Sequence, residues 1–312
     1  MAHFVLKINK DRILQMRQYY RNHLVTPAPA HTSFQAKLPG CTVTAYLSGK
    51  VLFQGKQAET ESSRWEGVPS QPKEKKARKT TPYSPPEQIA SLSVVGSDEV
   101  GTGDYFGPIT VVAAYVSKSQ LQLVKELGVK DSKNLKDPQI ITIAKDLIKT
   151  IPYSLLVLKN EKYNDLQQKG MSQGKMKAIL HNQAIGNVLE KLAGETPDAI
   201  LIDQFAEPDV YFKHLSGKKI MKENVYFSTK AEGIHLSVAA ASIIARYSFL
   251  MEMKKLEKKS GFTIPKGAGA LVDQAAARLI EQKGVNALAS FTKLHFANTN
   301  KAKLLAEKKG RG

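Results

Sequence analysis

The stretch formed by residues 96–108, GSDEVGTGDYFGP, constrains this chain more than any other part of the sequence. Apolar, β-prone runs precede and follow it, and two such runs around a glycine-rich turn predict a β-hairpin. Asp98 and Glu99 lie at the end of the first run, where carboxylates are costly unless they are paired or bound to a cation. Gly101 and Gly103 follow, and glycine lets a ligand approach backbone N–H groups closely. Carboxylates beside exposed backbone donors suit a divalent metal ion next to a polyanionic substrate.

The acidic pair also has an ordinary alternative, a solvated strand end before a glycine turn. Geometry limits the metal hypothesis as well, because neighbouring side chains in a regular strand point to opposite faces of the sheet. Asp98 and Glu99 can therefore reach one metal site only if the strand ends or bulges there. Gly96 and Gly101 would permit such a break.

Two further segments place an acid where a buried element ends. Asp203 follows the apolar run 199–202, and Glu232 precedes a long, small-residue-rich core helix predicted over residues 235–256. In α/β folds, chemistry gathers at strand ends. Asp203 could instead cap a turn or helix, and Glu232 could stabilise a helix dipole, worth about 0.3–1 kcal/mol.

Four carboxylates, those of Asp98, Glu99, Asp203 and Glu232, could neutralise two Mg²⁺ ions, and Mn²⁺ accepts the same oxygen ligands. Two such ions about 4 Å apart activate a water molecule and stabilise the leaving oxygen of a phosphodiester. The sequence contains no GxxxxGK[ST] motif and no evident serine–histidine pairing, so it does not favour a P-loop enzyme or a covalent hydrolase.

The charge and composition of the chain indicate which class of partner it binds and in which compartment it works. The chain has 312 residues and a net charge of +18, which indicates an anionic partner. Nucleic acid is favoured over a membrane, because no apolar run approaches the roughly 20 residues that span a bilayer. The N-terminus has only a short apolar patch, so we predict no signal peptide. A single cysteine, Cys41, excludes an internal disulfide and fits an intracellular, cytoplasmic protein.

The chain divides into three predicted parts. Residues 1–66 alternate as strand, helix, three strands and helix, and predict a small α+β domain that binds substrate. Residues 67–90 are rich in Pro, Ser, Lys and Glu and predict a flexible linker. Residues 91–312 alternate strands and helices, predict a catalytic α/β domain, and end in a basic tail. In the first domain some strand residues could bind a nucleic-acid backbone or be ordinary strand residues: Tyr46, Lys50, Phe53, Gln54 and Lys56.

These segments together resemble the type 2 ribonucleases H, and most closely the ribonuclease HIII branch. Residues 98–108 look like that branch's signature, which in ribonuclease HII carries an Arg between the two glycines. Residues 131–133, Asp-Ser-Lys, are similar to the second motif, and residues 200–203 to the third. Residues 230–232, with 241–245, resemble the fourth motif; its acid is Glu here, as in the HIII branch, and Asp in ribonuclease HII.

The resemblance implies an RNase H-like mixed sheet flanked by helices, preceded by a domain likened to the TATA-binding-protein fold. It also implies endonucleolytic hydrolysis of the RNA strand in RNA/DNA hybrids, leaving 5′-phosphate and 3′-hydroxyl ends. A noncatalytic protein that binds hybrids or duplexes is the alternative, and in either case we expect a monomer.

The resemblance assigns roles to individual residues. The catalytic metal ligands would be Asp98, Glu99, Asp203 and Glu232. Gly101-Thr102-Gly103 would read the 2′-hydroxyl through backbone groups, which is the group that separates RNA from DNA. The candidate phosphate contacts are Ser132, Lys133 and Lys230, which could equally be surface polar residues. The chain's other notable side chains, His181, His235 and His295, are interpreted as core or surface histidines.

Overall fold

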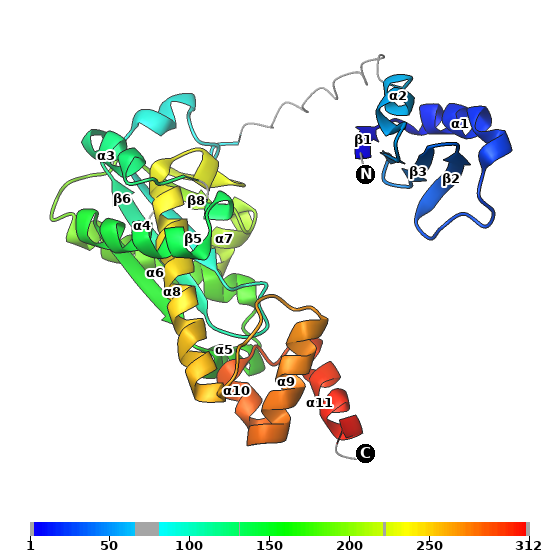
Figure 1. Cartoon of the computed structure of the whole chain (residues 1–312). Coiled ribbons are helices and arrows are strands. Elements are labelled where there is room, and N and C mark those ends of the chain that lie inside the picture. The colour runs from blue at the N-terminus through cyan, green and yellow to red at the C-terminus, as the bar shows by residue number, and fades with distance from the viewer. Residues whose placement is uncertain (1–2, 66–80, 131, 221–222, 310–312) are drawn as a thin grey trace. The chain divides into compact units, whose positions relative to one another are not determined.

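The chain folds into two compact units, Met1–Lys79 and Thr80–Gly312 (Figure 1). The computed structural model describes residues 3–65, 81–130, 132–220 and 223–309. Asp131 of the predicted second motif, and residues 67–80 of the predicted linker, lie outside the described residues.

The first unit is a four-stranded antiparallel sheet with two helices packed on one face. Its strands run in the order β1-β4-β3-β2, as β1 (His3–Lys7), β2 (Thr32–Leu38), β3 (Cys41–Tyr46) and β4 (Lys50–Gln54). Its helices are α1 (Lys10–Tyr19) and α2 (Ala58–Ser63). Phe53 faces the helices and is fully buried, so the prediction that it could bind nucleic acid is wrong. Strand alternation places the neighbouring Lys50 and Gln54 on the other face, and both are exposed.

The second unit is built on a five-stranded mixed sheet in the order β7-β6-β5-β8-β9. The strands are β5 (Val94–Val100), β6 (Ile109–Val116), β7 (Tyr153–Leu158), β8 (Ala199–Asp203) and β9 (Val225–Ser228). β5, β6 and β7 pair antiparallel, and β5 and β6 form the hairpin predicted around the glycine-rich turn. β8 and β9 join in parallel beside β5, so the ends of β5 and β8 meet at one edge of the sheet. The predicted mixed sheet is therefore confirmed.

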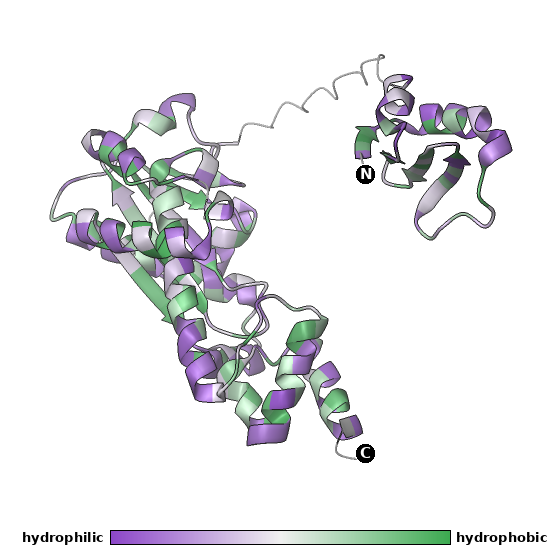
Figure 2. Cartoon of the chain, in the orientation of Figure 1, coloured by the Kyte–Doolittle hydropathy of each residue, from purple (hydrophilic) through white to green (hydrophobic). Residues whose placement is uncertain are grey.

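Helices cover both faces of this sheet. They are α3 (Leu121–Glu126), α4 (Asp137–Thr150), α5 (Asn160–Gln168), α6 (Gln173–Lys191), α7 (Pro208–His214) and α8 (Leu236–Ser260). One face packs against α6 and α7, and the other against α4 and α8. Figure 2 shows the strands coloured mainly as hydrophobic, while the last turns of α8 are hydrophilic.

Three further helices follow α8: α9 (Ala270–Lys283), α10 (Leu288–Phe291) and α11 (Asn298–Lys309). They build a separate small core around Tyr105 and Phe106, the aromatic residues of the glycine-rich stretch. The predicted basic tail is therefore helical in part, because Ala302 on α11 is buried in this core.

The helix α8 is buried along most of its length. By length and composition alone it could cross a membrane, but 72% of its apolar window is buried within this unit, as expected for a core helix. It approaches β5 very closely at Gly96, where an added Cβ would lie 2.3 Å from the backbone nitrogen of Val238. Gly96 therefore serves helix–sheet packing, and it lies in a regular, fully paired part of β5.

Residues 81–90, predicted as the end of the linker, pack onto the second unit. Tyr83 stacks near Phe212 and Phe227, with ring centroids 5.3 and 6.1 Å away, and its carbonyl accepts a hydrogen bond from the Phe227 N–H. Ile89 is also buried. Tyr83 packs against β9, and Ile89 packs in a cluster with residues of β5, β8 and α8, so the segment is held on the second unit despite its proline-rich composition.

Candidate active site

Three of the four predicted acids come together at one edge of the sheet. Asp98 and Asp203 follow Ser97 and Ile202, which are paired in the parallel register of β5 and β8. Asp203 Oδ1 accepts a hydrogen bond of 2.8 Å from the Ala231 N–H, which fixes the short turn that carries Glu232. Asp98 and Glu232 are only 7% and 6% exposed. The fold thus brings Asp98 next to acids that lie more than a hundred residues later in the chain.

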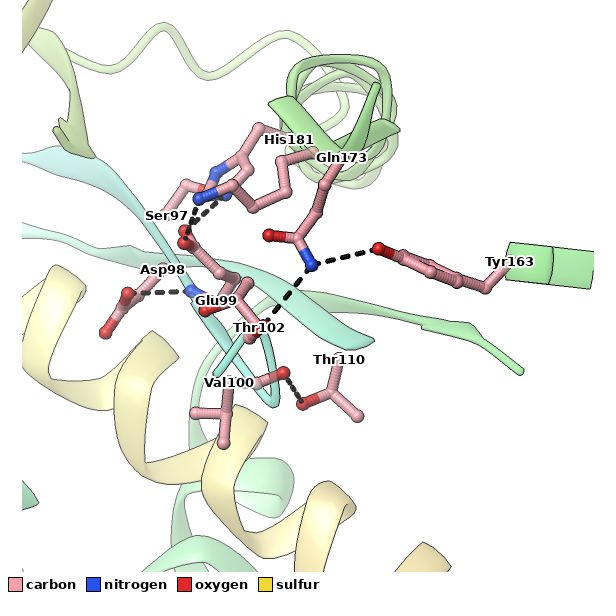
Figure 3. Close-up of polar contacts among 10 residues, drawn as sticks. Ser97, Asp98, Glu99, Val100, Thr102, Thr110, Tyr163, Gln173 and His181 are labelled. Carbon is pink, nitrogen blue, oxygen red and sulfur yellow. Dashed lines mark hydrogen bonds and ion pairs between the residues drawn. The ribbon is translucent and has the colours of Figure 1, made fainter. Parts of the chain in front are cut away.

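Glu99 lies on the opposite face of β5, as Figure 3 shows. The pairing of β5 with β6 continues without a bulge to Val100, so the strand does not bulge at the acidic pair but ends one residue after Glu99. The Glu99 carboxylate instead contacts α6, with Oε1 2.8 Å from Lys177 Nζ and Oε2 3.0 Å from His181 Nε2. No local pattern in the sequence marks Lys177 as a partner of Glu99, and His181 was expected only to be a core or surface histidine.

His181 also connects Glu99 to Ser97, whose Oγ lies 2.6 Å from His181 Nδ1. This arrangement has the order of a hydrolytic triad, in which serine must reach a substrate carbonyl. Ser97 is fully buried, and its hydroxyl donates to the Val112 carbonyl over 3.1 Å. A nucleophilic role for Ser97 is therefore excluded by access, and the chain of contacts serves to hold Glu99.

The acids influence one another's charge. Burial, followed by the charges of Glu99 and Asp203, raises the pKa of Asp98 well above its ordinary value, and a hydrogen bond from Ser242 opposes this. Burial, and then the charges of Glu232 and Glu99, also raise the pKa of Asp203. Burial alone would raise the pKa of Glu99, but His181 and Lys177 outweigh it and the net pKa is lowered. Mutual repulsion of this kind is relieved by a cation.

The donor set fits a hard divalent cation such as Mg²⁺ or Mn²⁺, which prefers carboxylate oxygens. Glu232 Oε2 is buried and has no hydrogen-bond partner among the described residues, while Oε1 contacts Lys133 Nζ. Such an orphaned carboxylate oxygen requires an explanation, and a bound ion is one. Across the described residues, no three His, Cys, Asp or Glu side chains are already arranged to hold one ion.

The glycine-rich loop offers backbone donors next to these acids. Gly101 has φ +96°, and an added Cβ would lie 2.2 Å from the Pro108 carbonyl oxygen. Gly103 is exposed and a Cβ there would meet nothing within 4 Å, so its lack of a side chain leaves the backbone open. In the described part of the chain, no acceptor contacts the N–H groups of Thr102 or Gly103. The Thr102 carbonyl accepts a bond of 3.3 Å from Gln173 on α6.

The candidate phosphate contacts occupy different environments. Ser132 is buried, with its hydroxyl 2.9 Å from that of Ser242, the residue that hydrogen-bonds Asp98. Lys133 and Lys230 are exposed at the rim. Arg246 on α8, which the sequence analysis did not single out, donates a bond of 2.6 Å to the Ser132 carbonyl and so holds this segment against α8.

The raised pKa of Asp98 predicts a cost in stability. The pKa of Asp98 in the folded state lies above the unfolded value of about 3.9. Ionisation of this carboxylate therefore lowers the free energy of unfolding as the pH rises above the unfolded pKa. In metal-free buffer at pH 7, Asp98→Asn should therefore raise the unfolding temperature, by about 2–4 °C for each 1 kcal/mol in a domain of this size. Scanning calorimetry in EDTA measures this, with exposed Asp146→Asn as the matched control. The advantage should vanish near pH 4; an equal or lower unfolding temperature at pH 7 contradicts it.

Both units of the chain resemble known proteins. A family model described as ribonuclease HII matches residues 95–299, and a domain of unknown function (DUF3378) matches residues 3–78. The chain is 67% identical over 311 residues to ribonuclease HIII of Bacillus subtilis (strain 168), covering 99% of both chains. It is 56% identical over 301 residues to ribonuclease HIII of Bacillus anthracis, covering 96% of this chain and 97% of that one.

Solved structures show the same architecture. The crystal structure of Bst-RNase HIII in complex with Mn²⁺ is 46% identical in sequence and has a TM-score of 0.69. The match covers 98% of this chain and 100% of that chain. The Aquifex aeolicus RNase H3 structure, at 24% identity and a TM-score of 0.54, covers 93% of this chain and 99% of that one, and shares the fold.

Proposed function

The chain belongs to the ribonuclease HIII family, and from that membership we propose that it is an endonuclease that hydrolyses the RNA strand of RNA/DNA hybrids, leaving 5′-phosphate and 3′-hydroxyl ends. One observation carries the proposal to this chain's own residues. The carboxylates of Asp98, Asp203 and Glu232 converge at the edge formed by β5 and β8, and one buried oxygen of Glu232 has no partner among the described residues.

We propose that Asp98, Glu99, Asp203 and Glu232 hold two Mg²⁺ or Mn²⁺ ions. Support comes from the mutual charge repulsion of these acids and from the relative that was solved with Mn²⁺. When bound, such ions activate the attacking water and stabilise the leaving oxygen. Glu99 would exchange its contacts with Lys177 and His181 for the ions, and Lys133 would exchange Glu232 for a substrate phosphate.

Recognition of RNA is assigned to the loop Gly101-Thr102-Gly103. Its N–H groups of Thr102 and Gly103 point to no acceptor in the described residues, so they can receive the ribose 2′-hydroxyl. A backbone reader does not depend on base sequence, which suits an enzyme that acts on any hybrid. We propose that three further residues position the substrate phosphates near this loop: Ser132, Lys133 and Lys230. The contact between the hydroxyls of Ser132 and Ser242 holds Ser132 in place.

The first unit is proposed to hold the hybrid. On its open sheet face, strand register places Lys7 of β1 opposite Lys50 of β4, and Val5 opposite Leu52. None of the residues in β1–β4 is Asp or Glu. A face that combines lysines with polar and apolar side chains, and lacks acids in its strands, suits a phosphate backbone.

The proposed enzyme works as a monomer in the cytoplasm. All four acids come from one chain, so the site needs no second copy. The single thiol, Cys41, is buried in the first unit and unbridged, which fits a reducing compartment.

A labelled RNA/DNA hybrid incubated with the protein tests this function. We expect fragments in Mg²⁺ or Mn²⁺ and intact substrate in EDTA, with activity restored when excess metal is added. The all-DNA duplex of the same sequence serves as the matched control and should stay intact. An intact hybrid under every metal condition, with binding retained, would favour the alternative of a noncatalytic binding protein.

A further inference from the structure

Lys293 lies in the segment between α10 and α11 and is fully buried, at 0% exposure. It is the only lysine that is buried among those whose burial is described. Its Nζ donates hydrogen bonds of 2.7 Å to the Asp104 carbonyl and 2.6 Å to the Gly107 carbonyl. The catalytic chemistry proposed above makes no use of this amine. Burying an amine costs free energy unless hydrogen bonds compensate for the lost contact with water.

The carbonyls that Lys293 holds belong to the glycine-rich stretch. Backbone bonds of 2.9 Å reinforce this contact, from Lys293 N to the Tyr105 carbonyl and from Gly107 N to the Phe291 carbonyl. Gly267 N, in the loop before α9, adds a bond of 2.6 Å to the Asp104 carboxylate. The C-terminal part of the second unit therefore fixes residues 104–107 from outside the central sheet.

The position of residues 104–107 determines that of the loop before them. Gly101 is in contact with the Pro108 carbonyl at the other end of the stretch, so the chain closes on itself between these two residues. The N–H groups of Thr102 and Gly103 lie within this closed segment. A shift of the Asp104 and Gly107 carbonyls would consequently move the two donors.

A donor, and not merely bulk, is required at position 293. An apolar side chain of equal length would fill the same space but leave the Asp104 carbonyl without this bond. Burial lowers the pKa of Lys293 to about 7, while the charge of Asp104 opposes that shift. The neutral amine still carries two N–H donors for its two acceptors, so the contacts persist in either protonation state.

We propose that Lys293 is a positioning residue for the loop Gly101-Thr102-Gly103, and that it thereby sets how strongly the enzyme distinguishes ribose from deoxyribose. This inference rests on the function proposed above. Lys293 Nζ hydrogen-bonds none of the four site acids; it acts through the two carbonyls that frame the loop.

The test uses the full-length chain carrying Lys293→Met and a hybrid whose RNA strand contains one 2′-deoxynucleotide. Cleavage is mapped at every phosphate, and the sugar preference is the rate at all-ribose phosphates divided by the rate at the modified one. We expect Lys293→Met to lower the cleavage rate at all-ribose phosphates about tenfold and to lower the sugar preference by a similar factor. This loss is smaller than the roughly 100-fold that a displacement of about 1 Å can cause. Exposed Lys283→Met is the matched control and should change neither value.

Two further variants keep the test decisive if Lys293→Met folds poorly. Lys293→Arg retains donors and should keep more of the preference than the Met variant. Asn160→Ala removes the other side-chain donor to the Gly107 carbonyl, a bond of 2.9 Å from α5, and should shift the preference in the same direction.

A lower overall rate with an unchanged sugar preference in Lys293→Met and Asn160→Ala would overturn the proposal, because it would show that these residues only support the fold. Failure of the unmodified chain to cleave any hybrid would instead contradict the proposed function. The two failures are therefore distinguishable.

Discussion

Replacing Asp203 with Asn should reduce cleavage of an RNA/DNA hybrid by about 10³-fold or more, while hybrid binding persists. The substitution keeps the size of the side chain and its hydrogen bond from Ala231, but removes a charge that faces Glu232 and Glu99. A 10³-fold loss corresponds to about 4 kcal/mol of transition-state stabilisation. Metal ions typically supply several kcal/mol of such stabilisation.

Single-turnover cleavage at saturating protein measures the effect, and anisotropy in EDTA measures binding of the same hybrid. Asp146→Asn, an exposed residue of α4, makes the same change of charge and should cleave normally. Near-normal turnover of Asp203→Asn in Mg²⁺ would show that the metal hypothesis for this site is wrong.

Deleting residues 1–66 should weaken hybrid binding by about 10- to 100-fold, with a shallower salt dependence and little change in the cleavage rate at saturating substrate. Each phosphate neutralised by a lysine contributes a slope of about 0.7–0.9 to the salt dependence of log K. The open face of the first unit carries Lys7, Lys37 and Lys50, so the slope should fall by about two to three.

Changing these three lysines to Gln in the full-length chain should reproduce most of the effect of the deletion. The matched control replaces three exposed basic residues of α1 and the turn after it with Gln, namely Lys10, Arg17 and Arg21. Binding is titrated at several salt concentrations in EDTA. A dissociation constant and a salt slope that both stay unchanged after the deletion would refute a substrate-binding role.

Much of the fold could be predicted because its signals are local. Apolar runs separated by glycine turns identify the hairpin of β5 and β6 and the strands of the first unit. The same apolar runs identify the acids at the ends of β5 and β8 as candidate site residues, because a carboxylate directly after a buried run is costly unless it is compensated. Where local signals are weak, prediction failed: the short helices α5 and α7 were missed, and α11 was read as a tail because its sequence is mostly polar.

The side-chain partners could not be predicted, because they depend on contacts between distant segments. Glu99 meets Lys177 and His181 from 78 and 82 residues away, and Asp104 meets Lys293 across 189 residues. The sequence does contain the alternation that turns Asp98 and Glu99 apart, and Gly96 and Gly101 were the two residues that would permit a break in the strand. Gly96 is instead needed for packing against α8, a partner in three dimensions that no local pattern reveals.

The contact between Gly96 and α8 also limits how this enzyme can diverge. A single added carbon at position 96 would lie 2.3 Å from the Val238 nitrogen and force the start of α8 away from the sheet. Asp98 lies two residues beyond this contact on β5, and Glu232 lies in the turn just before α8. The spacing of the acids is thus set by a main-chain contact, so a homologue that retains every acid but gains a methyl group here would preserve the motif and lose the geometry.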